Sequence, residues 1–231
     1  MRQKKTIEIM LLDDHPVILH GLAASLRGES GIRILGSFTT SQDLIKELQH
    51  QTADLVVLDY ALGPDQIDGL SLIRSLKVRF PNIRLLVLSA QHNAATVSMA
   101  MRVGADGFIG KEIDAGQLSI AIRRVARGQT YLAADMKEMI QDHQVCIDSG
   151  KDVYIDHSSA TPSGLLSYSL FTVREYEVIR CCLDGLSVTQ IAEKFSRSKK
   201  TISTQKHSAF KKLGVRNDNE LYKFRGQFEE L

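Results

Sequence analysis

The sequence of 231 residues predicts a doubly wound α/β domain with a five-stranded parallel sheet, followed by a small all-α domain. Two observations support this fold class. Patterns typical of strands and helices alternate five times in the first half, and helical periodicity without strands returns after residue 170. The length also exceeds that of a usual single domain. We therefore place the α/β domain at 6–129, a linker at 130–168 and the helical domain at 169–231.

The α/β domain is predicted from apolar runs separated by amphipathic segments. Near-continuous apolar runs are typical of strands buried on both faces of a parallel sheet. Four strong runs and one weaker run occur, at 7–12, 55–58, 85–88, 107–109 and, for the weaker run, 32–36. Segments with helical spacing lie between and after them, at 17–26, 42–49, 70–79, 94–103 and 117–127.

The linker is recognised by its composition. Residues 131–169 are rich in turn formers and poor in apolar residues, and we expect a helix there only near 136–141.

The helical domain begins with a capping signal. Thr172 and Glu175 have the spacing of a capping box at the start of a helix, which Asp184 and Gly185 end. A short second helix at 188–195 is followed by a polar turn. Either Ser198 or Thr201 can cap a third helix that runs to Leu213.

Composition excludes several classes of protein. No apolar run approaches the roughly 20 residues of a membrane-spanning helix, and the basic N-terminus lacks the apolar core of a signal peptide. We therefore expect a cytoplasmic protein with no membrane partner. The three cysteines and seven histidines show no spacing typical of metal ligands. The adjacent Cys181 and Cys182 are interpreted as small buried hydrophobic residues.

The overall charge of +2 hides an asymmetry between the two domains. Residues 169–231 hold 12 Lys and Arg against 8 Asp and Glu, while the rest of the chain is net negative. Between Ser187 and Arg216 there are 8 basic residues and a single acid, Glu193. This balance favours a polyanion as the partner of the helical domain.

Polar residues close the four strong strands of the predicted sheet. They are Asp13 with Asp14, then Asp59, Ser89 and Lys111. Because the carboxyl ends of parallel strands meet at one edge, we expect these side chains to lie together. Alone, each has an ordinary structural explanation, such as a helix cap for an aspartate or a solvated loop for the lysine. Their joint order and spacing favour a shared site.

The chemistry of that edge indicates phosphoryl transfer. Crowded carboxylates repel one another and attract a hard divalent cation, for which Mg²⁺ is the best fit. Lys111 supplies a positive charge and Ser89 a hydroxyl for an anion. A carboxylate would be the nucleophile.

The motifs at these strand ends resemble the receiver domain of two-component response regulators. They are Leu12-Asp-Asp-His-Pro, Val57-Leu-Asp59, Leu88-Ser89-Ala and Phe108-Ile-Gly-Lys111. The resemblance covers residues 6–129 and implies a flavodoxin-like sheet and a phosphate acceptor, Asp59, that a histidine kinase or histidine phosphotransfer protein supplies. It also implies a Mg²⁺ cofactor held directly by Asp14 and Asp59, through water by Asp13 and by the backbone carbonyl of Ala61. Ser89 and Phe108 would be the switch pair that senses the phosphate with Lys111.

The loop after Asp59 departs from the family pattern. It is two residues longer than usual before its Asp-Gly, and Gly63 precedes Pro64 where the family has the reverse order. Ala61 offers no polar side chain to hold an attacking water. We therefore expect a long-lived phosphoaspartate.

The third helix of the helical domain predicts a DNA-reading face. Ile202, Leu213 and either Ala209 or Phe210 face inward, whereas small polar and basic residues face outward. Small polar residues let a helix approach base edges, and lysines near its ends can reach phosphates. A solvated basic helix would be the alternative, but the preceding helix and turn favour DNA.

The helical domain resembles the LuxR-type helix-turn-helix of the NarL/FixJ class of response regulators. The resemblance is carried by Leu170-Phe-Thr-Val-Arg-Glu, Gly185-Leu-Ser-Val-Thr-Gln-Ile-Ala and Lys212-Leu-Gly-Val. The segment from Ser196 to Asp218, and the longer loop after Asp59, resemble the Rcs type of these regulators. The resemblance implies promoter DNA and a second regulator as partners, as a homodimer or as a heterodimer with a related regulator. The implied DNA-binding residues are Lys199, Lys200, Thr201, Ser203, Thr204, Lys206, His207 and Lys211.

Three functions remain distinguishable. The leading one is a transcription factor whose dimerisation and DNA binding depend on phosphorylation of Asp59. The alternative is a transcription factor independent of phosphate, whose receiver serves only for dimerisation or interaction. An enzyme, such as a phosphatase on a similar sheet, is disfavoured, because the second acid that such enzymes place two residues after the nucleophile is replaced by Ala61.

Overall fold

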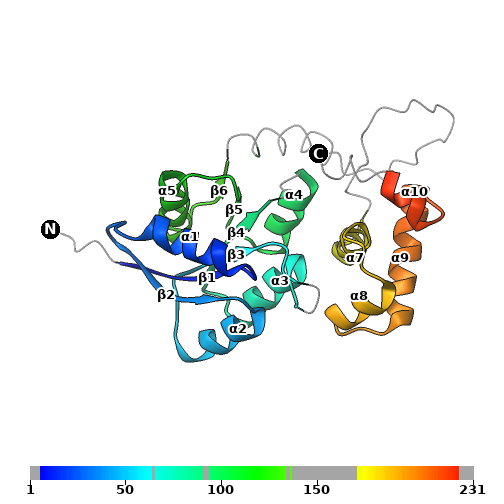
Figure 1. Cartoon of the computed structure of the whole chain (residues 1–231), viewed down its shortest axis with the longest axis horizontal. Helices are drawn as coiled ribbons and strands as arrows, with labels where there is room; N and C mark the ends of the chain where they lie inside the picture. Colours follow the sequence, from blue (N-terminus) through cyan, green and yellow to red (C-terminus); the bar gives the residue numbers. More distant parts are fainter. Residues whose placement is uncertain (1–5, 64–65, 91–93, 134–135, 137–170, 224–231) are drawn as a thin grey trace.

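A computed structural model describes residues 6–63, 66–90, 94–133, 136 and 171–223 of the chain. An α/β domain and a helical domain lie side by side (Figure 1). None of the described helices is long and apolar enough to cross a membrane. The helix expected near 136–141 falls, apart from Met136, outside the described residues, as does Cys146.

The sheet of the first domain has six parallel strands rather than the predicted five. Their order is β2-β1-β3-β4-β5-β6. The additional strand, β6, is only two residues long and lies in the segment that we assigned to the linker, pairing with β5. A two-residue strand is too short to produce a periodic pattern, so the sequence could not indicate it. The strands are β1 (Ile7–Leu12), β2 (Ile32–Phe38), β3 (Leu55–Asp59), β4 (Arg84–Ser89), β5 (Gly107–Gly110) and β6 (Tyr131–Leu132).

Five helices cover the two faces of this sheet. Helices α1 and α5 pack on one face, and α2, α3 and α4 pack on the other. Alternate residues of each central strand enter the two cores, with Ile9 and Leu11 on the α1 side and Met10 and Leu12 on the other. The predicted doubly wound arrangement is confirmed. The helices are α1 (Pro16–Leu26), α2 (Ser41–His50), α3 (Gly69–Arg79), α4 (Ala94–Val103) and α5 (Ala115–Ala126).

The topology places the functional residues at one edge. Strand β1 pairs with β2 on one side and β3 on the other, so the order of strands reverses there. In a doubly wound sheet the loops at such a point diverge to opposite faces and leave room for a ligand at the carboxyl ends of the strands.

The second domain contains four described helices. They are α7 (Val173–Leu183), α8 (Val188–Lys194), α9 (Lys199–Leu213) and α10 (Asp218–Lys223). The predicted capping box of Thr172 and Glu175 is present at the start of α7. Ser198, rather than Thr201, caps α9, because its hydroxyl accepts the Thr201 backbone N–H. Cys181 and Cys182 are buried, as predicted.

Glu175 ties α7 to α9 beyond its capping role. Its carboxylate accepts hydrogen bonds from Ser208 and Lys212, each at 2.6 Å. Burial alone would raise the pKa of Glu175, but these bonds and the cap lower it to about 2. The carboxylate therefore stays ionised and holds α9 against α7.

The two domains meet through α3 and α4 of the first and α7 and α8 of the second (Figure 1). Apolar residues on the α3–α4 side of the sheet form a continuous core with those of the helical domain. The contact also includes polar groups, since the Thr96 and Tyr176 hydroxyls lie 2.6 Å apart and the Ser71 hydroxyl donates to Glu177.

Candidate phosphate-accepting site and nucleic-acid interface

Three carboxylates come together at the carboxyl ends of β1 and β3. The last residues of the two strands are in parallel register, so the aspartates that follow or end them become neighbours. One oxygen each of Asp13, Asp14 and Asp59, and a ring nitrogen of His15, all lie within 4.8 Å of one another. Asp13 and Asp59 are buried, whereas Asp14 is partly exposed. The predicted meeting of these side chains is confirmed.

Lys111 bridges two of the carboxylates. Its ammonium group donates to Asp13 at 2.7 Å and to Asp59 at 2.8 Å. Burial would lower the pKa of Lys111, but the hydrogen bonds to the two carboxylates outweigh it and raise the pKa above its usual value. The lysine is therefore a fixed positive charge beside Asp59.

Asp59 is harder to ionise in this setting than an ordinary aspartate. Its burial raises the pKa to about 6, and the nearby charge of Asp13 adds to the rise, although Lys111 opposes both. A carboxylate that the protein does not fully stabilise gains from a divalent cation beside it. The donor set of aspartate oxygens, with a partly exposed Asp14 at its edge, fits Mg²⁺.

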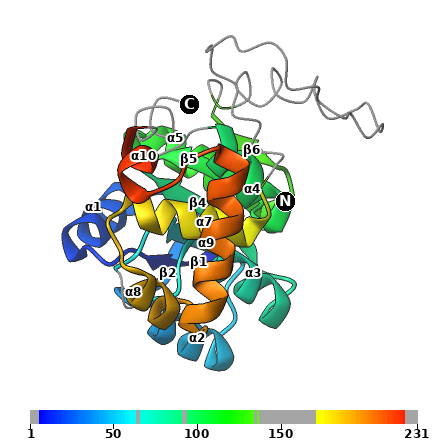
Figure 2. The ribbon, with the colours of Figure 1, turned by 90° about the vertical axis from the view of Figure 1, so that its right-hand side faces the viewer.

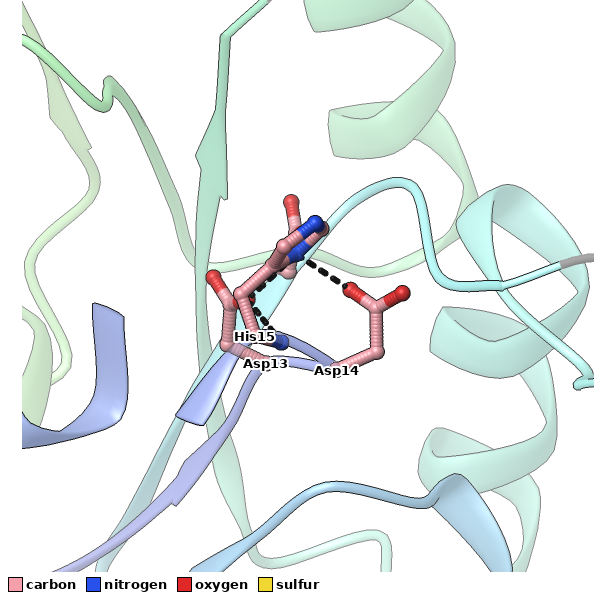
Figure 3. Close-up of side chains that lie close together, drawn as sticks. Asp13, Asp14 and His15 are labelled. Carbon is pink, nitrogen blue, oxygen red and sulfur yellow. Dashed lines mark hydrogen bonds and ion pairs between the residues drawn. The ribbon is translucent and has the colours of Figure 1, made fainter. Parts of the chain in front are cut away.

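His15 lies beside the cluster of Asp13, Asp14, Asp59 and Lys111, which we call the acidic pocket. The sequence did not indicate the contacts that its ring makes there. His15 is the N-cap residue of α1, but its side chain makes no cap bond. Figure 3 shows the imidazole turned toward both neighbours, with Nδ1 at 2.9 Å from Asp14 and 3.3 Å from Asp13. The ring is exposed and lies at the rim of the acidic pocket.

Ser89 and Phe108 lie on the neighbouring strands. Ser89 ends β4 and Phe108 is within β5, and both are buried. The carbonyl of Ser89 accepts the backbone N–H of Lys111 at 2.9 Å. The Phe108 ring lies 6.1 Å from the ring of Tyr60, the residue after Asp59.

The long loop after Asp59 returns to the pocket. The Ala61 N–H donates to Asp59 at 3.4 Å, and the Ala61 side chain is exposed. A Cβ atom on Gly63 would lie 3.5 Å from an Asp14 oxygen, so the backbone there runs close to the acidic cluster. The Leu62 N–H donates to buried Asp68.

Helix α9 presents the predicted DNA-reading face. Its inward residues Ile202, Ala209, Phe210 and Leu213 are all buried. Figure 2 shows α9 in front, on the side of its domain that faces away from the sheet. Most of the predicted contact residues are exposed, namely Lys199, Lys200, Thr201, Ser203, Thr204, His207 and Lys211.

Lys206 differs from the predicted outward orientation. Its ammonium group lies 2.6 Å from the Asp218 carboxylate at the start of α10 and 5.1 Å from the ring centre of Phe210. The residue is only partly exposed, because this pair holds its side chain against α10.

Comparison with known families agrees with both halves of the structure. Residues 9–123 match the response regulator receiver domain, and residues 169–224 match the bacterial regulatory proteins of the luxR family. The chain belongs to the DNA-binding response regulators. Its receiver domain is the α/β domain, and its DNA-binding domain is the helical one.

The regulator is similar over almost its whole length to curated RcsB proteins. It is 29% identical to the transcriptional regulatory protein RcsB of Salmonella typhi, over 94% of this chain and 93% of that protein.

Solved structures of RcsB from Salmonella typhimurium have the same fold. One, described as a study of conformational dynamism for DNA interaction, matches with a TM-score of 0.75 at 28% identity over 97% of this chain and 99% of that one. Another, bound to promoter rprA in the presence of the phosphomimetic BeF3-, matches with a TM-score of 0.72 at 27% identity over 98% and 100%. A structure of two RcsB dimers bound to two parallel DNAs matches with a TM-score of 0.58 at 27% identity over 96% and 99%.

Proposed function

We propose that Asp59 accepts a phosphoryl group from a phosphohistidine of a kinase or phosphotransfer protein, and that the phosphorylated regulator dimerises and binds promoter DNA. The observation that carries this proposal is the position of Asp59, buried between Lys111 and the two aspartates that follow β1. The phosphomimetic in the RcsB–promoter structure supports the link between this pocket and DNA. Since the partner is chromosomal DNA, the regulator would act in the cytoplasm.

The residues of the pocket have distinct roles in this reaction. A carboxylate oxygen of Asp59 attacks phosphorus while the bond from phosphorus to the histidine nitrogen breaks, which gives an acyl phosphate. Asp14, Asp59 and the Ala61 carbonyl would hold a Mg²⁺ ion directly and Asp13 would do so through water, and the bound ion would supply charge to neutralise the phosphoryl oxygens. Lys111 can exchange a carboxylate partner for a phosphoryl oxygen on Asp59, because its ammonium group already lies within hydrogen-bond distance of the Asp13 and Asp59 carboxylates.

Ser89 and Phe108 would carry the phosphorylated state outward. Ser89 is buried at the end of β4, the strand that pairs with β3, and from there its hydroxyl would donate to a phosphoryl oxygen on Asp59. A shift of Ser89 would open space that the buried Phe108 ring can follow, and so alter the surface formed by α4 and β5.

The exposed residues of α9 would enter the major groove of the promoter. Ser203, Thr204 and His207 lie on the exposed side of the helix, where base edges would be, and lysines at both ends would reach phosphates. The dimer of RcsB on DNA supports a homodimer for this regulator as well, with a related regulator as the alternative partner.

Phosphorylation with acetyl phosphate tests the proposal. The full chain is expected to gain one phosphoryl group, detected by intact mass, only with Mg²⁺ and only when Asp59 is present. The variant Asp59→Asn should gain none, while Asp54→Asn, just before β3 and at the opposite end of that strand from Asp59, should react like the wild type. Phosphorylation of Asp59→Asn at the wild-type rate would refute Asp59 as the acceptor.

A further inference from the structure

Two cations of the DNA-binding domain are buried against the loop that follows Asp59. Arg180 of α7 lies 2.9 Å from one oxygen of Asp68, and Lys194 of α8 lies 3.0 Å from the other. The side chains of Lys194 and Asp68 are 3% and 1% exposed. A buried charge is costly unless it is paired, and here each cation is paired with a different oxygen of the same carboxylate.

Lys194 is distinguished by the other groups that it contacts. Its ammonium group also donates to the backbone carbonyls of Gly63 at 3.0 Å and Leu62 at 3.3 Å. A lysine ammonium has three donors, and these three acceptors account for all of them. All three acceptors belong to the receiver domain, although Lys194 is the last residue of a helix in the DNA-binding domain.

The backbone that Lys194 holds is the wall of the acidic pocket. Gly63 lies against Asp14, and the Leu62 N–H donates to the same Asp68 carboxylate that Lys194 contacts. The carbonyl of Ala61, the proposed backbone ligand of the metal, is one residue before those that Lys194 binds. Lys194 and Asp68 together therefore fix both the N–H and the C=O of this short segment.

Two further contacts between the domains lie away from residues 61–63. Arg174 donates to the Ser71 hydroxyl of α3 at 2.6 Å, and Glu177 accepts from the same residue. These pairs join α7 to the side of α3 and leave the backbone of residues 61–63 untouched. A substitution of Arg174 therefore weakens the domain contact without removing a hydrogen bond from residues 61–63.

We propose that Lys194 is a positioning residue for phosphoryl transfer at Asp59, acting from the DNA-binding domain on the loop that completes the metal site. The proposal rests on the proposed function of Asp59. By linkage, a movement of α8 that withdraws Lys194 would change the affinity of the pocket for Mg²⁺ and phosphate. Binding of Mg²⁺ and phosphate would in turn change the stability of the contact between Lys194 and the loop by the same free energy.

The test compares Lys194→Met with Arg174→Met in the full chain. Both variants remove a cation from the domain contact, but only the first removes support from the loop. The first readout is the rate of backbone hydrogen exchange in the segment 60–69, measured by mass spectrometry without Mg²⁺. The second is the Mg²⁺ concentration that gives half-maximal phosphorylation by acetyl phosphate, in which the phosphoryl group moves to Asp59 and acetate leaves.

Lys194→Met is expected to speed exchange in the loop and to raise the Mg²⁺ requirement about threefold or more, in the direction seen when groups that support metal ligands are lost. Loss of a positive charge near the pocket would by itself lower that requirement, so a rise reports on geometry. Lys194→Gln, which keeps an NH2 group with two donors but no charge, should fall between the wild type and Lys194→Met, and it serves if the methionine variant is unstable.

An unchanged or lowered Mg²⁺ requirement in the Lys194 variants would overturn the proposal, as would an equal rise in Arg174→Met. If the wild type itself takes up no phosphate, the proposed function fails instead. The hydrogen-exchange comparison without Mg²⁺ still reports whether Lys194 holds the loop.

Discussion

The fold works against the ionisation of Asp59. Its carboxyl is buried beside Asp13, and burial raises its pKa to about 6. The unfolded chain would ionise the same group near its ordinary value of 3.8. Above pH 6 the folded protein therefore carries a charge that it holds less favourably than the unfolded chain does.

Asp59→Asn is consequently expected to stabilise the Mg²⁺-free protein by about 3 kcal/mol at pH 7.5, because the pKa rises from 3.8 to about 6 and each pKa unit corresponds to about 1.4 kcal/mol. The gain should be full above pH 6, shrink as the pH falls from 6 to 3.8 and vanish below, because both states then bind the proton. Urea unfolding of both proteins in EDTA across this range measures it. A gain that grows toward low pH would contradict this reading of the pocket, and added Mg²⁺ should reduce the gain.

We expect Ala61 to affect the lifetime of the phosphoaspartate. The Ala61 backbone N–H donates to Asp59, and its exposed methyl group cannot hold an attacking water. Ala61→Asn adds such a group, and the phosphoaspartate should then decay several times faster. Loss of label from acetyl-phosphate-treated protein measures the rate, and rapid decay that is equal in both proteins would show that Ala61 has no part in it.

Helix α9 is the element that we propose to contact DNA, and its neighbours hold it in position. Ser198 caps its first turn, Glu175 anchors its last turns through Ser208 and Lys212, and the buried residues of one side leave the other free. Lysines at its start add positive charge where a phosphate backbone would pass.

Lys200→Ala should weaken binding to all duplex sequences alike and reduce the slope of log affinity against log salt concentration by about 1, as expected for one lost phosphate contact. Fluorescence anisotropy at several salt concentrations measures both. Lys46→Ala on α2, an exposed lysine of the receiver, is the matched control and should change neither. An unaltered slope in Lys200→Ala would remove this lysine from the interface.

In the whole molecule, the receiver domain and α9 lie on opposite sides of α7 and α8 (Figures 1 and 2). The receiver contacts α7 and α8 and leaves α9 exposed. The arrangement of the two domains therefore sets the orientation of α9 and leaves its exposed side uncovered. The buried ions around Asp68 are the polar centre of that arrangement.

Asp68→Asn should open the two domains, because it leaves Arg180 and Lys194 buried without their counter-charge, and breaking a buried pair costs about 3 to 5 kcal/mol. Small-angle X-ray scattering should record a larger radius of gyration. Asp184→Asn removes the other, more exposed carboxylate near Arg180 and should leave the radius unchanged. Equal radii for both variants would mean that the Asp68 cluster does not hold the domains together.

The features that could be predicted from the sequence are those with a local or periodic pattern, and the side chains that parallel strands bring to one edge. Parallel strands end at one edge, so Asp13, Asp59 and Lys111 could be placed together, and a capping box marked the start of α7. The contact of Lys194 and Arg180 with Asp68 joins residues more than a hundred positions apart, and no local pattern indicates it. Periodicity likewise placed Lys206 on the outward face of α9, but it did not indicate the ion pair of Lys206 with Asp218.

The central claim is that phosphate at Asp59 controls DNA binding, and one measurement tests it most directly. Fragments of genomic DNA retained by the full chain are sequenced with Mg²⁺, in the presence and absence of beryllofluoride as a phosphoryl mimic. We expect the mimic to enrich a defined set of promoters for the wild type and to have no effect on Asp59→Ala. Identical promoter occupancy in all four samples would contradict the phosphate switch and favour a receiver that serves only for interaction.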